Sequence, residues 1–223
     1  DRTIARVVVL LGGIAAMLAG LASAAGILLR GDLVTSEVIT VRGEVVRVVT
    51  EGLYRYNSDS IVAEGVGWDS VTLLVVAPAT LIALFLLWRG CLRAALVSAG
   101  LLAYFAYQSF EYAVFGAYGP LYPLYVGTLA TSVSALALLV YGLDLELVAE
   151  RVSERFPRRA VTAYAVINVV ILAGLWLPVI GGTLGGEVTD VLEGASTLVV
   201  PAFDLGLLVP LGIFTAVAVW RRL

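Results

Sequence analysis

Six apolar runs, each about as long as a membrane is thick, constrain this chain more than any other feature. Hydrophobic residues make up 61% of its 223 residues, and charged residues only 14%. A helix of about 20 apolar residues crosses the roughly 30 Å of bilayer hydrocarbon, whereas soluble domains are much less apolar. The sequence therefore predicts an all-α integral membrane protein with a six-helix transmembrane bundle. The predicted spans are 4–29, 70–88, 92–115, 121–143, 160–180 and 198–220.

The first apolar run resembles the hydrophobic region of a signal peptide, with small residues of the cleavage-site type around 22–25. It is longer than such regions, which normally have roughly 7–15 residues. We therefore expect it to be an uncleaved span. Residues 1–223 as a whole are predicted to form a single transmembrane domain.

Arginine is the only cation of this chain, which lacks lysine and histidine, and its distribution predicts an orientation. Cytoplasmic segments of membrane proteins are enriched in positive residues. We therefore expect a multi-pass protein of the plasma membrane with both termini in the cytoplasm. The arginines on the expected cytoplasmic side are Arg2, Arg6, Arg89, Arg93, Arg151, Arg155, Arg158, Arg159, Arg221 and Arg222. The other four share one acidic loop and are Arg30, Arg42, Arg47 and Arg55.

That loop, predicted to be extracellular over residues 30–69, is too long for a simple connector. Its segments 38–41 and 44–50 are rich in β-branched residues, and Arg42-Gly43 between them is a turn candidate. This pattern predicts a small β-hairpin that covers the outer mouth of the helices.

Two local signals mark helix boundaries. Asp69 or Ser70 is the expected N-cap of the second span, because either side chain can accept a first-turn N–H. Residues 144–157 combine an apolar stripe with charged neighbours four residues apart. This pattern predicts an amphipathic helix that lies on the cytoplasmic membrane surface and ends at Pro157.

Small residues recur at every fourth position of the first span, at Gly12, Ala16, Gly20 and Ala24. Such a row allows two helices to approach closely in lipid. We expect it to pack against a neighbouring span of the same chain. A dimer interface is the alternative.

The residue types that the chain lacks exclude several functions. Without lysine there is no retinal or pyridoxal Schiff base. Without histidine there is no histidine-ligated haem, no Ser–His catalytic pair and no ordinary zinc site. The lone Cys91, expected to be reduced at the cytoplasmic boundary, allows neither an internal disulfide nor an iron–sulfur cluster. We expect no cofactor, no metal site and no nucleic-acid partner.

Polar side chains inside the apolar runs mark the candidate ligand or ion site. They are Tyr104, Tyr107, Gln108, Glu111, Tyr125, Asn168 and Asp204. Those on the third span follow helical steps and share one face. A carboxylate at the bilayer centre costs about 3 kcal/mol on insertion scales, so both acids are expected to face the bundle interior. They are expected to pair with Arg30, Arg42, Arg47 or Arg55, to stay protonated, or to hold a cation.

Prolines within or beside the spans, at Pro78, Pro201 and Pro210, free backbone carbonyls for local use. Broken helices of transporters use such carbonyls at substrate sites. A plain kink that improves helix packing is the favoured interpretation.

Several short motifs resemble an uncharacterised family of bacterial and archaeal membrane proteins with about six spans. They are Arg42-Gly43-Glu44, Gly52-Leu53-Tyr54, Gly67-Trp68-Asp69-Ser70-Val71-Thr72-Leu73, Arg89-Gly90, Tyr104-Phe105 with Tyr107, Pro120-Leu121-Tyr122 with Tyr125, and Asp204-Leu205-Gly206 with Pro210. The similarity covers nearly the whole chain, and the order of the motifs is its most specific feature. It implies the polytopic fold and no known activity. Glu111 departs from the family's small or hydroxyl residue, so the resemblance favours Asp204.

Two functional hypotheses follow. The first is binding or transport of a small solute, cation or proton through an outward-facing polar cavity, with Asp204 as the exchangeable charge. The second is a non-catalytic subunit or scaffold, which would use the glycine row and the loop cap to contact a second copy or a membrane-complex partner. An enzyme that acts on a lipid head group with two carboxylates is the least favoured interpretation.

Overall fold

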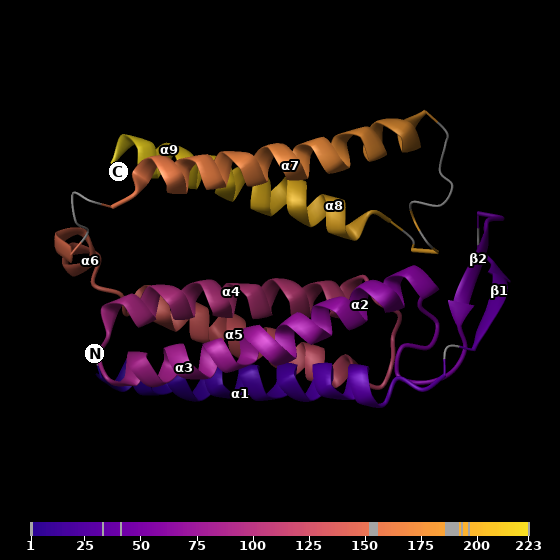
Figure 1. Cartoon of the computed structure of the whole chain (residues 1–223), viewed down its shortest axis with the longest axis horizontal. Helices are drawn as coiled ribbons and strands as arrows, with labels where there is room; N and C mark the ends of the chain where they lie inside the picture. The colour runs from indigo at the N-terminus through magenta and orange to yellow at the C-terminus, as the bar shows by residue number, and fades with distance from the viewer. Residues whose placement is uncertain are drawn as a thin grey trace. The chain divides into compact units, whose positions relative to one another are not determined.

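The computed structural model describes residues 2–32, 34–40, 42–151, 156–185, 192, 194–195 and 197–222. Contacts divide the chain into two compact units, Asp1–Val148 and Ala149–Leu223. Five of the described helical segments are long and apolar enough to cross a membrane: Arg2–Leu28, Asp59–Trp88, Tyr122–Tyr141, Arg158–Leu184 and Val199–Arg221. The prediction of an all-α protein built from apolar helices is confirmed (Figure 1). A single domain over residues 1–223 stays a prediction.

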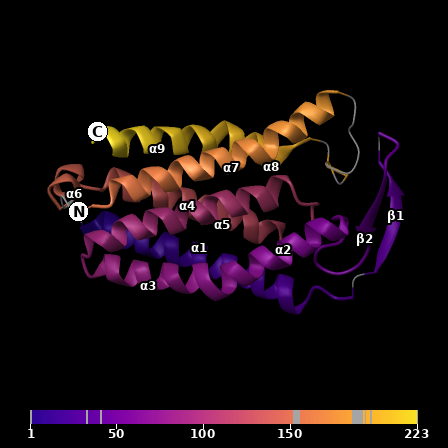
Figure 2. The same ribbon diagram turned by 45° about the horizontal axis from the view of Figure 1, so that its top comes forward.

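The first unit contains four long helical rods, and successive rods run antiparallel (Figure 2). They are α1 (Arg2–Leu28), the continuous rod of α2 (Asp59–Val71), π-helix η1 (Thr72–Val76) and α3 (Ala77–Trp88), then α4 (Leu92–Val114) and α5 (Tyr122–Tyr141). Short connections after α3 and α4 make successive rods antiparallel neighbours. At 23 residues α4 is about 34 Å long, enough to cross a bilayer. Its tyrosine, glutamine and glutamate side chains make it less apolar than the five segments above.

The second rod begins earlier than the sequence predicts. The outer loop ends at Ser58 and not at residue 69, because α2 starts at Asp59. Ser58 is the N-cap, and its hydroxyl accepts the N–H of Ile61 at 3.2 Å. The prediction that Asp69 or Ser70 caps the helix is therefore wrong. The glycines of α2 favour a loop by propensity, but packing of α2 against α1 outweighs that preference.

The predicted β-hairpin is confirmed in the outer loop. Strands β1 (Thr35–Ile39) and β2 (Val45–Val49) pair antiparallel, with Thr35 opposite Val49. The Thr40 hydroxyl accepts the N–H of Glu44 at 3.2 Å and helps to close the turn. Val41, part of the predicted first strand, lies outside the described residues. The hairpin extends beyond the α2 end of the bundle (Figure 1).

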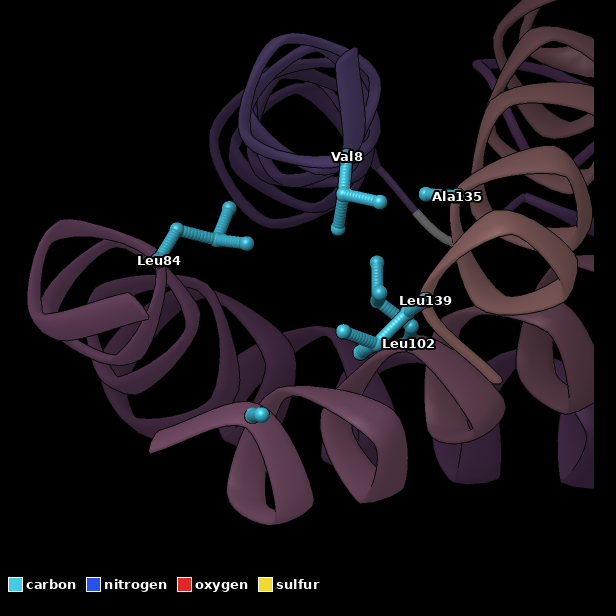
Figure 3. Packing of buried hydrophobic residues seen from close by; sticks show 6 residues of the cluster. Val8, Leu84, Leu102, Ala135 and Leu139 are labelled. Carbon is cyan, nitrogen blue, oxygen red and sulfur yellow. The ribbon is translucent and has the colours of Figure 1, made fainter. Parts of the chain in front are cut away.

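The core of the first unit lies between all four rods. One cluster contains Val8, Leu84, Ala95, Leu102, Ala135 and Leu139, most of which point toward one another in Figure 3. A second cluster lies closer to the hairpin end and contains Ala15, Ala16, Ala19, Val76, Ala77 and Phe105. The alanines of α1 leave room for the Phe105 ring, which is 1% exposed. We name these two clusters the apolar barrier, and the buried hydroxyl groups of Thr80, Ser98 and Ser132 lie at the same levels of the rods.

The small-residue row of α1 divides between two environments. Gly12 and Ala16 are buried in the bundle, and a Cβ on Gly12 would lie 3.0 Å from Leu84. Gly20 has nothing within 4 Å of such a Cβ, and Ala24 is only half-buried. A spacing of four advances about 40° per step relative to the helix, so the row rotates out of the interface. The first half of the row therefore packs within the first unit.

The second unit is an antiparallel helix pair. Helix α7 (Arg158–Leu184) packs against the continuous rod of α8 (Val199–Phe203), π-helix η2 (Asp204–Leu208) and α9 (Val209–Arg221). These helices cover the last two predicted spans within a few residues.

The predicted interfacial helix corresponds to α6 (Leu145–Arg151), which Asp144 caps by accepting the N–H of Leu147 at 2.9 Å. The end of that prediction, at Val152–Arg155, lies outside the described residues.

Shortening a core leucine should destabilise the first unit. Leu102 is 0% exposed, and its truncation to alanine removes contacts on several sides. We expect Leu102→Ala to lower the free energy of unfolding by about 2–5 kcal/mol. Leu96 of the same helix is 48% exposed and serves as the matched control, because Leu96→Ala leaves the core intact. Thermal melting in detergent measures both, and equal losses would contradict the described packing.

Candidate functional site

A buried carboxylate, that of Asp69, is the centre of the candidate site. It lies in the last turn of α2 and is 1% exposed. The Tyr54 hydroxyl donates to its Oδ2 atom, and the Ser23 side chain hydrogen-bonds to it as well. The Tyr112 hydroxyl lies 3.0 Å from the Gly65 carbonyl and 3.4 Å from Asp69 Oδ1, so its hydrogen is shared. Donors from three different segments thus surround one acid.

Tyr125 completes the site. Its ring stacks on that of Tyr112, with centroids 4.8 Å apart and planes 20° apart. Its side chain also hydrogen-bonds with Tyr54. We name Ser23, Tyr54, Asp69, Tyr112 and Tyr125 the acid–tyrosine cluster. Its members come from α1, the outer loop, α2, α4 and α5, so the cluster joins all four rods at the hairpin end.

Arginine does not neutralise this acid. Asp69 has no arginine within 4 Å among the described residues. Arg47 pairs with Asp59 instead, at 3.9 Å, and both side chains are about half exposed. Such a surface pair contributes little to stability. Arg55 lies over the Tyr56 ring at 5.5 Å, and Arg30 and Arg42 are exposed. The donors around Asp69 are neutral hydroxyl groups.

The loop before α2 positions Tyr54 through its backbone. Gly52 has a φ of +79°, and a Cβ there would lie 1.9 Å from the Arg30 carbonyl oxygen, so only glycine fits. The Asn57 amide donates to the Tyr54 carbonyl at 3.0 Å and accepts the N–H of Ala117 at 2.7 Å. Asn57 therefore ties this loop to the α4–α5 connection. Burial raises the pKa of the Tyr54 hydroxyl well above its usual range. Tyr54 therefore stays protonated and donates a hydrogen bond to Asp69.

A glycine of α1 makes room for the Tyr54–Asp69 pair. A Cβ on Gly26 would lie 2.3 Å from both Asp69 Oδ2 and the Tyr54 hydroxyl oxygen. Any side chain at this position would therefore push the two groups apart. The sequence offers no motif that marks Gly26, because the loop that brings Tyr54 there is distant along the chain.

A small cavity of about 20 Å³ adjoins the cluster. Its lining includes Ser23, Thr72, Gln108 and Thr128, and the buried Thr128 hydroxyl has no hydrogen-bond partner among the described residues. This volume is enough for one water molecule and too small for an organic solute. On the side of the cavity away from the hairpin, Phe105 and the apolar barrier close the bundle.

The residues predicted for the site lie in both units. In the first unit, Gln108 lines the cavity, Tyr125 belongs to the cluster, and the Tyr104 hydroxyl lies 2.7 Å from that of Thr72. Tyr107 and Glu111 are half-buried on the same helix. Asp204 and Asn168 belong to the second unit. There Asp204 accepts the Trp176 indole N–H at 2.7 Å, and Asn168 donates to the Tyr164 carbonyl at 2.8 Å.

Sequence reasoning missed Ser23, Tyr54, Asp69 and Tyr112 as site residues. The signal that identifies Asp69 is Ser58-Asp59-Ser60, because a hydroxyl N-cap followed by an acid is typical of a helix start. A helix from residue 59 places Asp69 three turns inside the rod, where a charge needs a partner. No comparable signal exists for Tyr54.

Comparison with protein-family models, curated proteins and solved structures gives no match. The resemblance to a six-span membrane family stays a prediction. The chemistry of the site therefore rests on its own residues.

Substituting Gly26 should separate the acid from its phenol donor. We expect Gly26→Ala to destabilise the protein by about 1–3 kcal/mol, because the new methyl group collides with both partners. Gly20→Ala on the same helix meets no atom within 4 Å and should be neutral or slightly stabilising, since alanine favours a helix. Thermal melting in detergent distinguishes the two, and equal behaviour would contradict the close approach at Gly26.

The raised pKa of Tyr54 predicts a loss of stability in alkali. An unfolded tyrosine loses its proton around its ordinary pKa of 10.0, whereas the folded Tyr54 keeps it to higher pH. The folded state then binds more protons, so this stabilisation is complete below pH 10 and decreases as pH rises above it. Tyr54→Phe should show a shallower decrease, although its stability at neutral pH is lower. Chemical denaturation in detergent from pH 7 to 11 measures both slopes, and parallel slopes would count against a buried neutral Tyr54.

Proposed function

We propose that this chain is a six-span plasma-membrane protein, with α4 as the span beyond the five apolar segments. In this proposal both termini are cytoplasmic, and Asp69 binds and releases a proton in the outer half as part of a transport process. The observation that carries it is a carboxylate buried among hydroxyl groups, with no arginine within 4 Å among the described residues. The arginine patches between the helices support the orientation. A scaffold role stays the alternative prediction.

The surroundings of Asp69 favour a group that changes its protonation state. Burial away from water opposes the charged carboxylate. Hydroxyl donors from Ser23, Tyr54 and Tyr112 favour it. These opposing effects bring the free energies of the two states closer together, which a proton-exchange site requires. An arginine partner would instead hold the acid in its charged form.

The size of the cavity favours a proton over a solute. At about 20 Å³ it takes a water molecule, and its hydroxyl and amide lining offers that water several partners. Water next to a carboxylate can deliver or accept a proton. Tyr54 belongs to the outer loop, so its hydroxyl connects the acid with the hairpin end. In the described conformation the apolar barrier leaves access from that end, so transport requires a second conformation that opens the other end.

Replacing the acid should abolish proton binding at this site. We expect Asp69→Asn to remove one carboxyl C=O stretching band that disappears on titration with base in infrared difference spectra. In pyranine-loaded proteoliposomes under an imposed membrane potential, the same variant should lose most of the proton uptake.

Asp59→Asn is the matched control, because Asp59 is an exposed acid at the start of the same helix. We expect it to retain both the infrared band and the proton uptake. An unchanged infrared titration in Asp69→Asn would overturn the proton site. A lost band with unchanged uptake would keep the site and overturn its role in transport.

A further inference from the structure

A second and larger cavity lies at the other end of the first unit. It has a volume of about 600 Å³ and lies between the first turns of α1 and α4 and the last residues of α3 and α5. The apolar barrier separates it from the acid–tyrosine cluster, so the two sites are independent. The cavity is not needed for proton binding at Asp69.

Positive charge surrounds the mouth of this cavity. Arg2, Arg6 and Arg89 line it and are exposed, and among the described residues none has a carboxylate within 4 Å. Asp144 also lines it, but its carboxylate is engaged in capping α6. The cavity therefore carries an excess of positive charge. Arg89 also lies over the Phe85 ring at 5.0 Å, and an anionic ligand would supply the counter-charge that the three arginines lack.

The start of α4 adds to this potential. Its N-cap, Cys91, makes no side-chain hydrogen bond to the first turn, and both Cys91 and Leu92 line the cavity. The first-turn N–H groups of a helix without a side-chain cap are unpaired donors at its positive end. They support anion binding at a site that the three arginines already favour.

The inner part of the cavity is apolar. Val8, Ala95 and Leu139 are buried there, and Ile4 and Leu143 add further apolar surface. A free phosphate ion leaves this apolar surface exposed to water, whereas an amphiphile covers it with hydrocarbon. Ligand pockets of about 300–1,000 Å³ take molecules of drug size, so this cavity fits a head group and the upper part of an acyl chain.

We propose that this cavity binds one anionic phospholipid of the cytoplasmic leaflet. The phosphate lies between Arg2, Arg6 and Arg89, where guanidinium groups can donate paired hydrogen bonds. The glycerol and the upper acyl chain cover the apolar wall. The rest of the chain follows the exposed apolar surface, where Trp88 lies at the cavity edge.

Lipid binding to the purified full-length chain in a neutral detergent tests the proposal. Native mass spectrometry and thermal melting are measured with phosphatidylglycerol, with phosphatidylcholine of the same acyl chains, and with inorganic phosphate. We expect phosphatidylglycerol to bind and to raise the melting temperature, and the other two to have little effect. Each of Arg2→Gln, Arg6→Gln and Arg89→Gln should weaken binding about fivefold, and the triple variant about a hundredfold.

The control is the triple variant Arg30→Gln, Arg42→Gln and Arg55→Gln, which removes the same charge from exposed positions at the hairpin end. It should bind phosphatidylglycerol as the wild type does. A variant that folds has the melting temperature of the wild type in phosphatidylcholine alone. This measurement, together with the single variants, distinguishes lost lipid binding from misfolding. Unchanged phosphatidylglycerol binding in the cavity variants, equal binding of phosphatidylcholine, or an equal effect of inorganic phosphate would each overturn the proposal.

Discussion

The burial of one carboxylate organises the hairpin end of the first unit. Asp69 is buried away from water within an apolar rod, so its carboxylate oxygens need hydrogen-bond donors. The nearest donors belong to other segments. Tyr54 reaches it because Gly52 bends the loop and Gly26 leaves space on α1. Tyr112 reaches it from α4. Each contact therefore also fixes the position of a rod or loop, which is why one acid can align four helices at this end.

Proline and a π-helical turn occur at the same spacing in both units. The π-helices η1 and η2 each end two residues before a proline, at Pro78 and Pro210. In each, the residue before the proline donates its N–H five residues back, to the carbonyl of Thr72 or of Asp204. Proline cannot donate and its ring crowds the preceding turn, so the helix widens there without breaking. Both π-helical turns begin with a buried polar residue, Thr72 or Asp204. This favours local widening of the helix over the plain kink expected from sequence.

The sequence predicts features that depend on local composition and misses those that depend on distant segments. Apolar runs of about 20 residues identify the helices because strands are much shorter, and β-branched strands around Arg42-Gly43 identify the hairpin. The start of α2 was not predictable from glycine propensity, because packing against α1 decides it. Likewise, reading Asp69 as a cap excluded it from the site. Tyr54 lies in a loop without a motif, and only tertiary structure brings it to the acid.

Arginine is the only cation of this chain, and the buried Asp69 is stabilised without an arginine within 4 Å among the described residues. Arginine does not lose its proton in proteins, so burying it within the rods would require a full ion pair away from water. Asp69 is instead stabilised by tyrosine and serine hydroxyls, and Asp204 accepts an indole N–H from Trp176. Neutral donors leave a buried acid able to change its charge. Arg2, Arg6 and Arg89 lie at helix ends, where they are available to an anion from outside the chain.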